Sequence, residues 1–285
     1  MSDDDGRKKL TTYARLKLQM DELHLFADLV NRGLSYSASA TRVVDILRRG
    51  VKAGLHKDLT EEHLNQQEDQ AARVEQFAIE QIAQGFPYLY GLLAIRIWTI
   101  LEDLVDGIVL NRLNDKSLLL GLPALEALSV PFVQFLNSSE QSREELILEA
   151  LKQNTKSRLK VGVGRFESLL DAVGLGGAVP DSVKRTLLEL SEVRNVLVHR
   201  DGMCDNRIPE RCPWLGLRAG NRVAVTSEMF GAYTLLPLWI MIESYRRNKN
   251  IEPGAEEIAQ ITLQEIGQKL SRYLTDVTRL PNGSE

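Results

Sequence analysis

The stretch that decides the fold is YLYGLLAIRIWTILEDLVDGIVLNRL, residues 88 to 113, the most apolar helical segment of the chain. It follows Pro87, and Arg96 interrupts its apolar run. The uninterrupted part is therefore shorter than the roughly 18 uncharged residues that a membrane span needs. This pattern predicts a helix buried in a protein core, against which other helices pack.

Apolar residues recur at helical spacing on the N-terminal side of this segment. They predict a first helix that contains residues 16–30 and ends near Gly33, and a second over residues 44–55. Thr60 is placed to cap a third helix that ends near Gly85, because Glu62 follows in its first turn. All three expected elements are helices.

The C-terminal side also favours helices. Ser142 and Glu145 have the spacing of a capping box, and a short helix is expected from Gly164 to Leu175, closed by Gly176 or Gly177. Further helices are expected over residues 180–200, from about residue 227, and over residues 256–274, with one short extended piece at residues 222–225. The sequence therefore predicts an all-α protein, a helical bundle.

Composition limits the classes of function. The 285 residues carry a formal net charge of -4, so the chain lacks the strongly basic balance of electrostatic nucleic-acid binders. Any nucleic-acid contact must be local. Residues 194–222 offer such a patch, with six arginines against three acids, although a solvated loop would have the same composition.

The N-terminal residues, MSDDDGRKK, are acidic before they are basic, unlike a signal or transit peptide, and we expect a cytoplasmic protein without a membrane partner. Cys204 and Cys212 are the only cysteines, and we expect both to be reduced. A zinc site that uses them with His199 would lack the fourth ligand that structural sites have. We predict no metal and no cofactor.

One polar cluster interrupts an apolar helix: SEVRNVLVHRDG, residues 191–202. On an ideal helix Arg194 lies within the core stripe, while Asn195 and His199 share the opposite face. The angle around the helix axis between Arg194 and His199 is about 140 degrees. The two groups can act on one phosphate only if the helix distorts before Gly202 or a second copy completes the site.

Structural roles are the alternative for each residue. Glu102 and Asp106 lie four residues apart on one helix face, where they could bind a metal, and we favour ion pairs with an arginine of a neighbouring helix. Arg194 could be that partner, for Glu102, Asp103 or Asp106. His199 could instead interact with the carbonyls at the end of its own helix.

The motif RNVLVH resembles the RxxxxH motif of HEPN domains, the higher eukaryote and prokaryote nucleotide-binding domains. The segments IWTILEDLVDG, RFESLLDAVGL, LLELSEVRNVLVHRDG and GNRVAVT add to this resemblance, which covers roughly residues 81–248. It implies a HEPN-type bundle over residues 81–250, with additional N-terminal helices in residues 1–80 and a C-terminal helix and tail in residues 251–285.

The resemblance implies a homodimer that cleaves RNA without metal, as in toxin–antitoxin pairs and antiviral defence, where a partner protein can neutralise the activity. Arg194, Asn195 and His199 would be the catalytic residues. His199 would move the proton, Arg194 would hold the phosphate, and Asn195 would orient the histidine or donate to the phosphate. Arg200 would bind substrate.

Two other functions stay open from the sequence. Some HEPN members are catalytically silent, so the chain could be a dimerisation or partner-binding module. A DNA-binding regulator could use the basic helix with Arg42, Arg48, Arg49 and Lys52, although one basic helix does not establish a helix-turn-helix.

Overall fold

The computed structural model describes residues 11–55, 59–115, 121–153, 163–248 and 254–279. Within these ranges every regular element is a helix, which confirms the all-α class. The extended piece predicted at residues 222–225 is reduced, in the described part, to an isolated bridge between Met203 and Arg222. None of the described helices combines the length and apolar character needed to cross a bilayer.

The chain forms two compact units. The first combines the described residues up to Met20, those from Ala94 to Val223 and those from Glu228 on, and the second combines Asp21–Leu93 with Ala224–Ser227. Helix α1 (Thr12–Ser37) begins in the first unit and ends in the second, and helix α4 (Pro87–Leu113) does the reverse.

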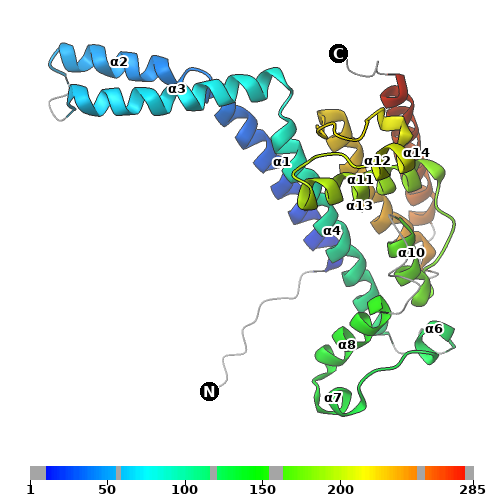
Figure 1. Ribbon diagram of the computed structural model, residues 1–285. Helices are drawn as coiled ribbons and strands as arrows, with labels where there is room; N and C mark the ends of the chain where they lie inside the picture. Colours follow the sequence, from blue (N-terminus) through cyan, green and yellow to red (C-terminus); the bar gives the residue numbers. More distant parts are fainter. Residues whose placement is uncertain (1–10, 56–58, 116–120, 154–162, 249–253, 280–285) are drawn as a thin grey trace, which may run out of the picture. The chain divides into compact units, whose positions relative to one another are not determined.

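In the second unit, α2 (Ala40–Lys52) and α3 (Glu61–Ala83) lie side by side (Figure 1). Thr60 caps α3 as predicted, since its side chain accepts a hydrogen bond from the amide of His63 at 3.3 Å. The predicted end of the first helix near Gly33 is wrong. The backbone of Gly33 stays helical and α1 continues to Ser37, whose hydroxyl donates to the Gly33 carbonyl at 2.8 Å.

Polar contacts fix α2 on α3. The hydroxyl of Thr41 donates to Glu75 at 2.6 Å, and Arg48 donates to Glu68, also at 2.6 Å. Arg48 also reaches the side-chain oxygen of Asn65 at 3.1 Å. One of the four basic residues of α2 is therefore committed to α3 rather than free to contact a nucleic acid.

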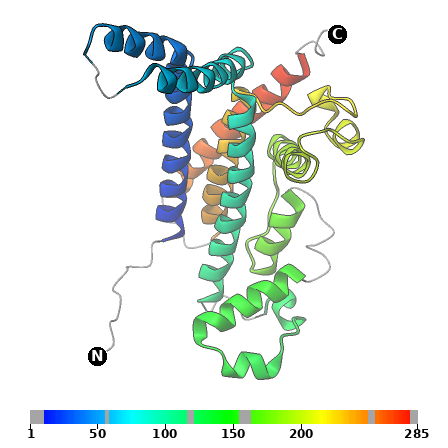
Figure 2. The same ribbon diagram turned by 60° about the vertical axis from the view of Figure 1, so that its left-hand side comes forward.

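The remaining helices belong to the first unit. Helices α6 to α8 follow α4 in the chain and lie near one end of it in both views (Figures 1 and 2). The elements are α6 (Pro123–Glu126), α7 (Phe132–Asn137), α8 (Glu140–Gln153), α10 (Val163–Ala172), α11 (Asp181–His199), α12 (Arg207–Arg211), the 3-10 helix η1 (Pro213–Leu215), α13 (Ser227–Arg247) and α14 (Ala255–Arg279).

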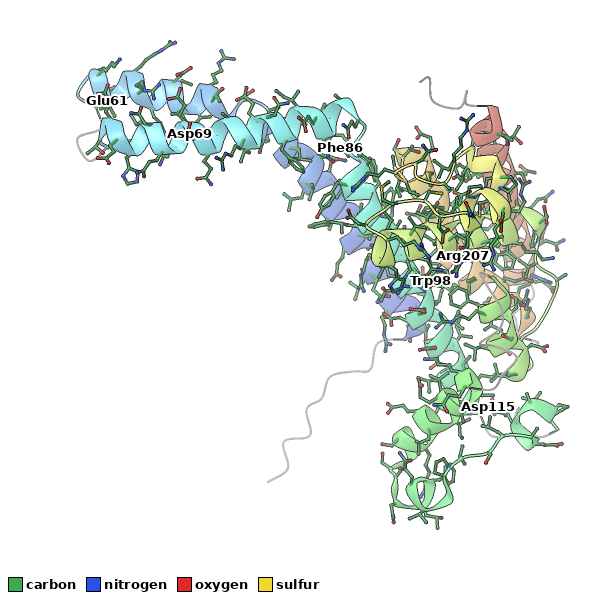
Figure 3. The ribbon with its side chains drawn as sticks, in the orientation of Figure 1. Glu61, Asp69, Phe86, Trp98, Asp115 and Arg207 are labelled. Atoms are coloured by element: carbon green, nitrogen blue, oxygen red, sulfur yellow. The ribbon has the colours of Figure 1, made fainter. Side chains whose placement is uncertain are left out.

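The core of this unit is built from α4, α10, α11 and α13. Trp98 of α4, labelled in Figure 3, packs its ring 5.2 Å from that of Phe166 in α10. Other core residues have essentially no exposed surface: Ile97, Ile100, Leu101 and Val105 of α4, Val183, Leu187, Leu190 and Val193 of α11, and Tyr233, Leu236 and Ile240 of α13. The stripe predicted for residues 183–193 is thus confirmed, whereas Leu197 is only half-buried.

Two predicted helix ends are wrong, because local backbone geometry decides them. Helix α8 begins at Glu140, and Ser139 rather than Ser142 accepts the first-turn amide, that of Ser142 itself, at 3.3 Å. Helix α10 ends at Ala172, where Gly174 has a φ of 76° and turns the chain two residues before the predicted glycines.

Candidate active site at the end of helix α11

Helix α11 carries the RNVLVH motif on its last turns and is regular up to His199. The amides of Arg200 and Gly202 both donate to the carbonyl of Val196, at 3.0 and 3.1 Å, and close the helix. Asp201 and Gly202 have positive φ values of 50° and 75°, which turn the chain away. The helix therefore does not distort between Arg194 and His199.

Arg194 is a cation without a carboxylate partner among the described residues. Its side chain is half-buried, and its one hydrogen bond there is a long one of 3.4 Å from Nη1 to Oδ1 of Asn195. Its Nε is buried and has no partner in the described part of the chain. A buried donor that is left unpaired costs about 1–3 kcal/mol, so this guanidinium is set up to receive an acceptor, above all an anion.

The acids that could have neutralised Arg194 are used elsewhere. Glu102 pairs with Arg165 at 3.0 Å, which is the ion pair with an arginine that we expected, and Asp106 pairs with Lys152 at 2.6 Å. Asp103 accepts a hydrogen bond from Gln19 at 3.2 Å. The alternative in which Arg194 pairs with one of these three acids is therefore wrong.

Asn195 and His199 lie one turn apart on the other face of α11. Asn195 is half-buried and His199 is exposed. The regular helix keeps His199 about 140 degrees around the axis from Arg194. One copy of α11 therefore presents the two catalytic candidates in different directions.

Arg200, the candidate substrate-binding residue, forms an ion pair with Asp205 at 3.2 Å. Most other arginines of residues 194–222 are also paired: Arg207 with Asp205, Arg211 with Glu192, and Arg222 with Asp201. Figure 3 labels Arg207 in this segment. Of these six arginines, Arg194 and Arg218 have no carboxylate partner among the described residues, so only two guanidiniums of the patch are free of an ion pair.

The segment after α11 folds back on the helix and covers part of the face that carries Asn195 and His199. Glu192, which belongs to that face, is 2% exposed, and its carboxylate lies 2.7 Å from the guanidinium of Arg211 in α12. The segment is closed by backbone bonds from Cys204 to Asn221 and from Val223 to Gly202, both 2.8 Å. His199 is thus exposed, at the edge of the part of α11 that the following segment covers.

The sequence analysis did not identify Glu189, the carboxylate that joins α11 to η1, α13 and α14. Glu189 of α11 has no exposed surface, and burial raises its pKa. It accepts hydrogen bonds from the indole of Trp214 at 2.6 Å, from the hydroxyl of Tyr233 at 2.8 Å, and from the hydroxyl of Tyr273 of α14. The sequence does contain a signal for this site, because Glu189 lies between the core residues Leu187 and Leu190. A carboxylate buried at such a position needs hydrogen-bond donors that are buried with it.

Cys212 lies near the carboxylate of Glu189, whereas Cys204 lies near Asp205. Both are buried free thiols, whereas His199 is exposed. Burial, with the charges of Glu189 and Glu192, raises the pKa of Cys212 to about 12. Nowhere in the described ranges do three or more His, Cys, Asp or Glu side chains gather in a way that could hold a metal ion.

The geometry of Arg194 is thus the decisive observation at this site. Comparisons with known families, curated proteins and solved structures found no match. The functional assignment accordingly depends on the chemistry of the residues at the end of α11.

Proposed function

We propose that the chain is a metal-independent endoribonuclease of HEPN type that acts as a homodimer in a toxin or antiviral-defence system. The observation that carries the proposal is the half-buried guanidinium of Arg194, which has no carboxylate partner among the described residues and a buried Nε without an acceptor. A phosphate oxygen would supply the missing acceptor, and the planar guanidinium suits bidentate phosphate binding.

RNA supplies its own nucleophile, so the protein needs only to move a proton and stabilise charge. A base removes the proton of the 2'-hydroxyl, the 2'-oxygen bonds to phosphorus, and the bond to the 5'-oxygen breaks as that oxygen gains a proton. The products are a 2',3'-cyclic phosphate and a 5'-hydroxyl. His199 takes or delivers the proton, because histidine is the side chain that most often acts as a general acid or base.

Arg194 stabilises the charge that builds on the phosphate in the transition state. Asn195 lies one turn before His199 and accepts a long hydrogen bond from Arg194 through its Oδ1. Because the regular helix separates Arg194 from His199 around its axis, each site combines Arg194 of one copy with His199 of the other. A homodimer is therefore part of the mechanism.

The test is cleavage of mixed RNAs by the purified full-length chain in the presence of a chelator. Loss of the general acid–base group in His199→Ala should lower the rate by about 10²–10⁴-fold, and Arg194→Ala by about 10²–10³-fold. The matched controls are His63→Ala and Arg272→Ala, which remove an exposed histidine of α3 and an exposed arginine of α14. Both controls should cleave at the wild-type rate.

The products provide a second measurement. The 5'-hydroxyl fragments should accept labelled phosphate from a polynucleotide kinase without prior dephosphorylation. Intact RNA after incubation with a folded dimer would overturn the proposal in favour of the silent module. Equal losses in His199→Ala and His63→Ala would do the same.

A further inference from the structure

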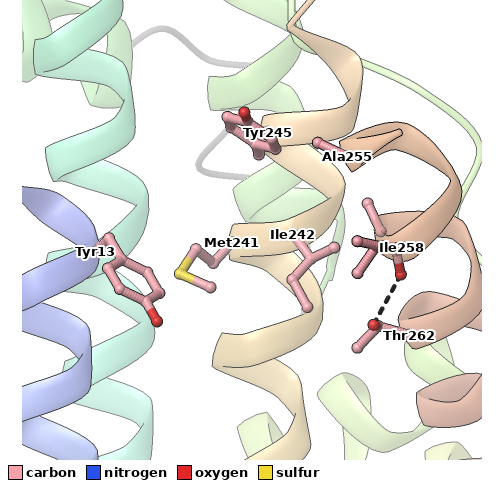
Figure 4. A pocket seen from close by; sticks show the side chains of 8 residues that line it. Tyr13, Met241, Ile242, Tyr245, Ala255, Ile258 and Thr262 are labelled. Atoms are coloured by element: carbon pink, nitrogen blue, oxygen red, sulfur yellow. Dashed lines mark hydrogen bonds between the residues drawn. The ribbon is translucent and has the colours of Figure 1, made fainter. Parts of the chain in front are cut away.

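An apolar groove lies in the first unit, away from the end of α11. Its volume is about 430 Å³, within the size range of small-molecule sites. Figure 4 shows its walls, which come from α1, α13 and α14: Tyr13, Met241, Ile242, Tyr245, Ile258 and Thr262. The hydroxyl of Thr262 donates to the carbonyl of Ile258 at 2.8 Å, so this wall offers its methyl group rather than a free donor.

A second cavity of about 280 Å³ adjoins the groove, and Tyr13, Met241 and Tyr245 line both. Its lining is more polar than that of the groove, because Asn111, Arg112, Ser244 and Asn248 contribute to it. The two cavities together offer an apolar channel with a polar end. This division matches a ligand with an alkyl chain and a polar head.

Ser244 marks the polar end. The residue is 5% exposed, and its hydroxyl is buried with no hydrogen-bond partner in the described ranges. A serine in a helix commonly donates to the carbonyl four residues earlier, yet this one does not. Its hydroxyl is therefore a donor that an acceptor in the cavity would satisfy.

Arg112 gives the polar end its positive charge. Its Nε donates to the carbonyl of Val173 at 3.2 Å and its Nη1 to the side-chain oxygen of Asn248 at 3.2 Å. Both acceptors are neutral, and no carboxylate in the described part of the chain forms an ion pair with Arg112. Asp115 also lines the cavity, but this residue is exposed, so solvent screens the charge of its carboxylate.

We propose that this channel binds a single-chain carboxylate amphiphile. The alkyl chain lies in the groove of α1, α13 and α14. The carboxylate accepts from the Ser244 hydroxyl and lies near the charge of Arg112. This site is separate from the residues assigned to RNA cleavage, and its test does not depend on that activity.

The test is calorimetric titration of the full-length chain with dodecanoate below its micelle concentration, for which one site is expected. Ile258→Ser removes an apolar wall residue and should raise Kd about fivefold to tenfold. Ile261→Ser is the matched control, because Ile261 is an exposed isoleucine of the same helix that does not line the groove. Its Kd should equal that of the wild type.

The head group is tested with a second variant and a second probe. Ser244→Ala should raise Kd about threefold to tenfold without lowering the melting temperature, because the hydroxyl makes no hydrogen bond in the free protein. Dodecyltrimethylammonium has the same tail with a cationic head and should bind at least tenfold more weakly.

Several outcomes would overturn the proposal. Absence of dodecanoate binding would do so, as would equal Kd values for Ile258→Ser and Ile261→Ser. Equal affinity for the cationic amphiphile, or an unchanged Kd in Ser244→Ala, would show that no carboxylate site exists at the polar end. Loss of self-association in Ile258→Ser, without dodecanoate binding to the wild type, would assign the groove to a contact between copies.

Discussion

Arg211 of α12 reaches the buried carboxylate of Glu192 on α11, with 2.7 Å between Nη1 and Oε1. The carboxylate is 3% exposed, so it needs a cationic partner. Arg194 follows Glu192 by two residues, about 200 degrees around the same helix, so it points away from this carboxylate. The partner of Glu192 therefore has to come from another segment, and α12 supplies it.

The unpaired side chain of Arg194 should not contribute to the free energy of unfolding of the chain. Arg194→Met keeps the volume and removes the unpaired Nε, so the free energy of unfolding should stay unchanged or rise by about 1 kcal/mol. Arg247→Met is the contrast, because Arg247 is 6% exposed and bonds to Glu167, Glu243 and two carbonyls. Its loss leaves the half-buried carboxylate of Glu167 without its cationic partner, whereas Glu243 keeps Arg246, and should cost about 1–3 kcal/mol. Urea denaturation measures both, and equal losses would contradict the assignment of Arg194 as unpaired.

The regular helix between Arg194 and His199 predicts complementation between inactive variants. In a mixed dimer of Arg194→Ala and His199→Ala, one of the two sites combines an intact arginine with an intact histidine. Mixing the purified variants, after a step that allows subunit exchange, should restore RNA cleavage, whereas each variant alone stays inactive. A mixture with no activity despite exchange would mean that each chain holds a complete site.

Glu189 predicts a pH dependence of stability. Its pKa is raised by burial above the ordinary value of 4.5, so the folded chain holds this proton more tightly than the unfolded chain does. The stabilising contribution is complete below the unfolded pKa and is lost as pH rises through the folded pKa. Unfolding free energies measured from pH 4.5 upward should therefore fall more for the wild type than for Glu189→Gln, which cannot titrate.

The control for Glu189→Gln is Glu265→Gln, which removes an exposed carboxylate of α14. This variant should follow the wild-type curve over the same pH range. Parallel curves for the wild type and Glu189→Gln would contradict a carboxylate that binds its proton more tightly when folded.

Cys212 should be unreactive in the folded chain. With a pKa of about 12, its thiolate fraction at pH 8 is about one part in ten thousand, and the side chain is fully buried. A Cys204→Ser variant, which leaves Cys212 as the only thiol, should react slowly with an aromatic disulfide reagent in buffer and quickly in urea. Reaction in buffer at the rate of a free thiol would show that the cover formed by α12 and η1 opens easily.

The sequence predicted helices and the core stripe of α11, because periodicity reports which side of a helix is apolar. It did not predict that Glu192 would be buried, since its cover is Arg211 on a later segment. The end of α1 was missed for a local reason: Gly33 can end a helix, but here its backbone stays helical and the helix continues. A contact with a distant residue therefore explains the burial of Glu192, and local backbone conformation explains the length of α1.

The candidate site was predictable only in part. The motif identified Arg194, Asn195 and His199 by residue type, and helix geometry predicted their separation. The ion pairs of Arg200, Arg207, Arg211 and Arg222 depend on turns after α11 that a sequence pattern does not specify. These pairs leave Arg194 and Arg218 as the arginines of this segment that form no ion pair in the described part of the chain.

The bond between Glu189 and Tyr273 joins residues 84 positions apart. The hydroxyl of Tyr233 in α13 donates to the same oxygen, and the indole of Trp214 in η1 donates to the other one. One carboxylate therefore connects α11 to three later segments of the chain, and separation of α14 alone would still leave it two donors.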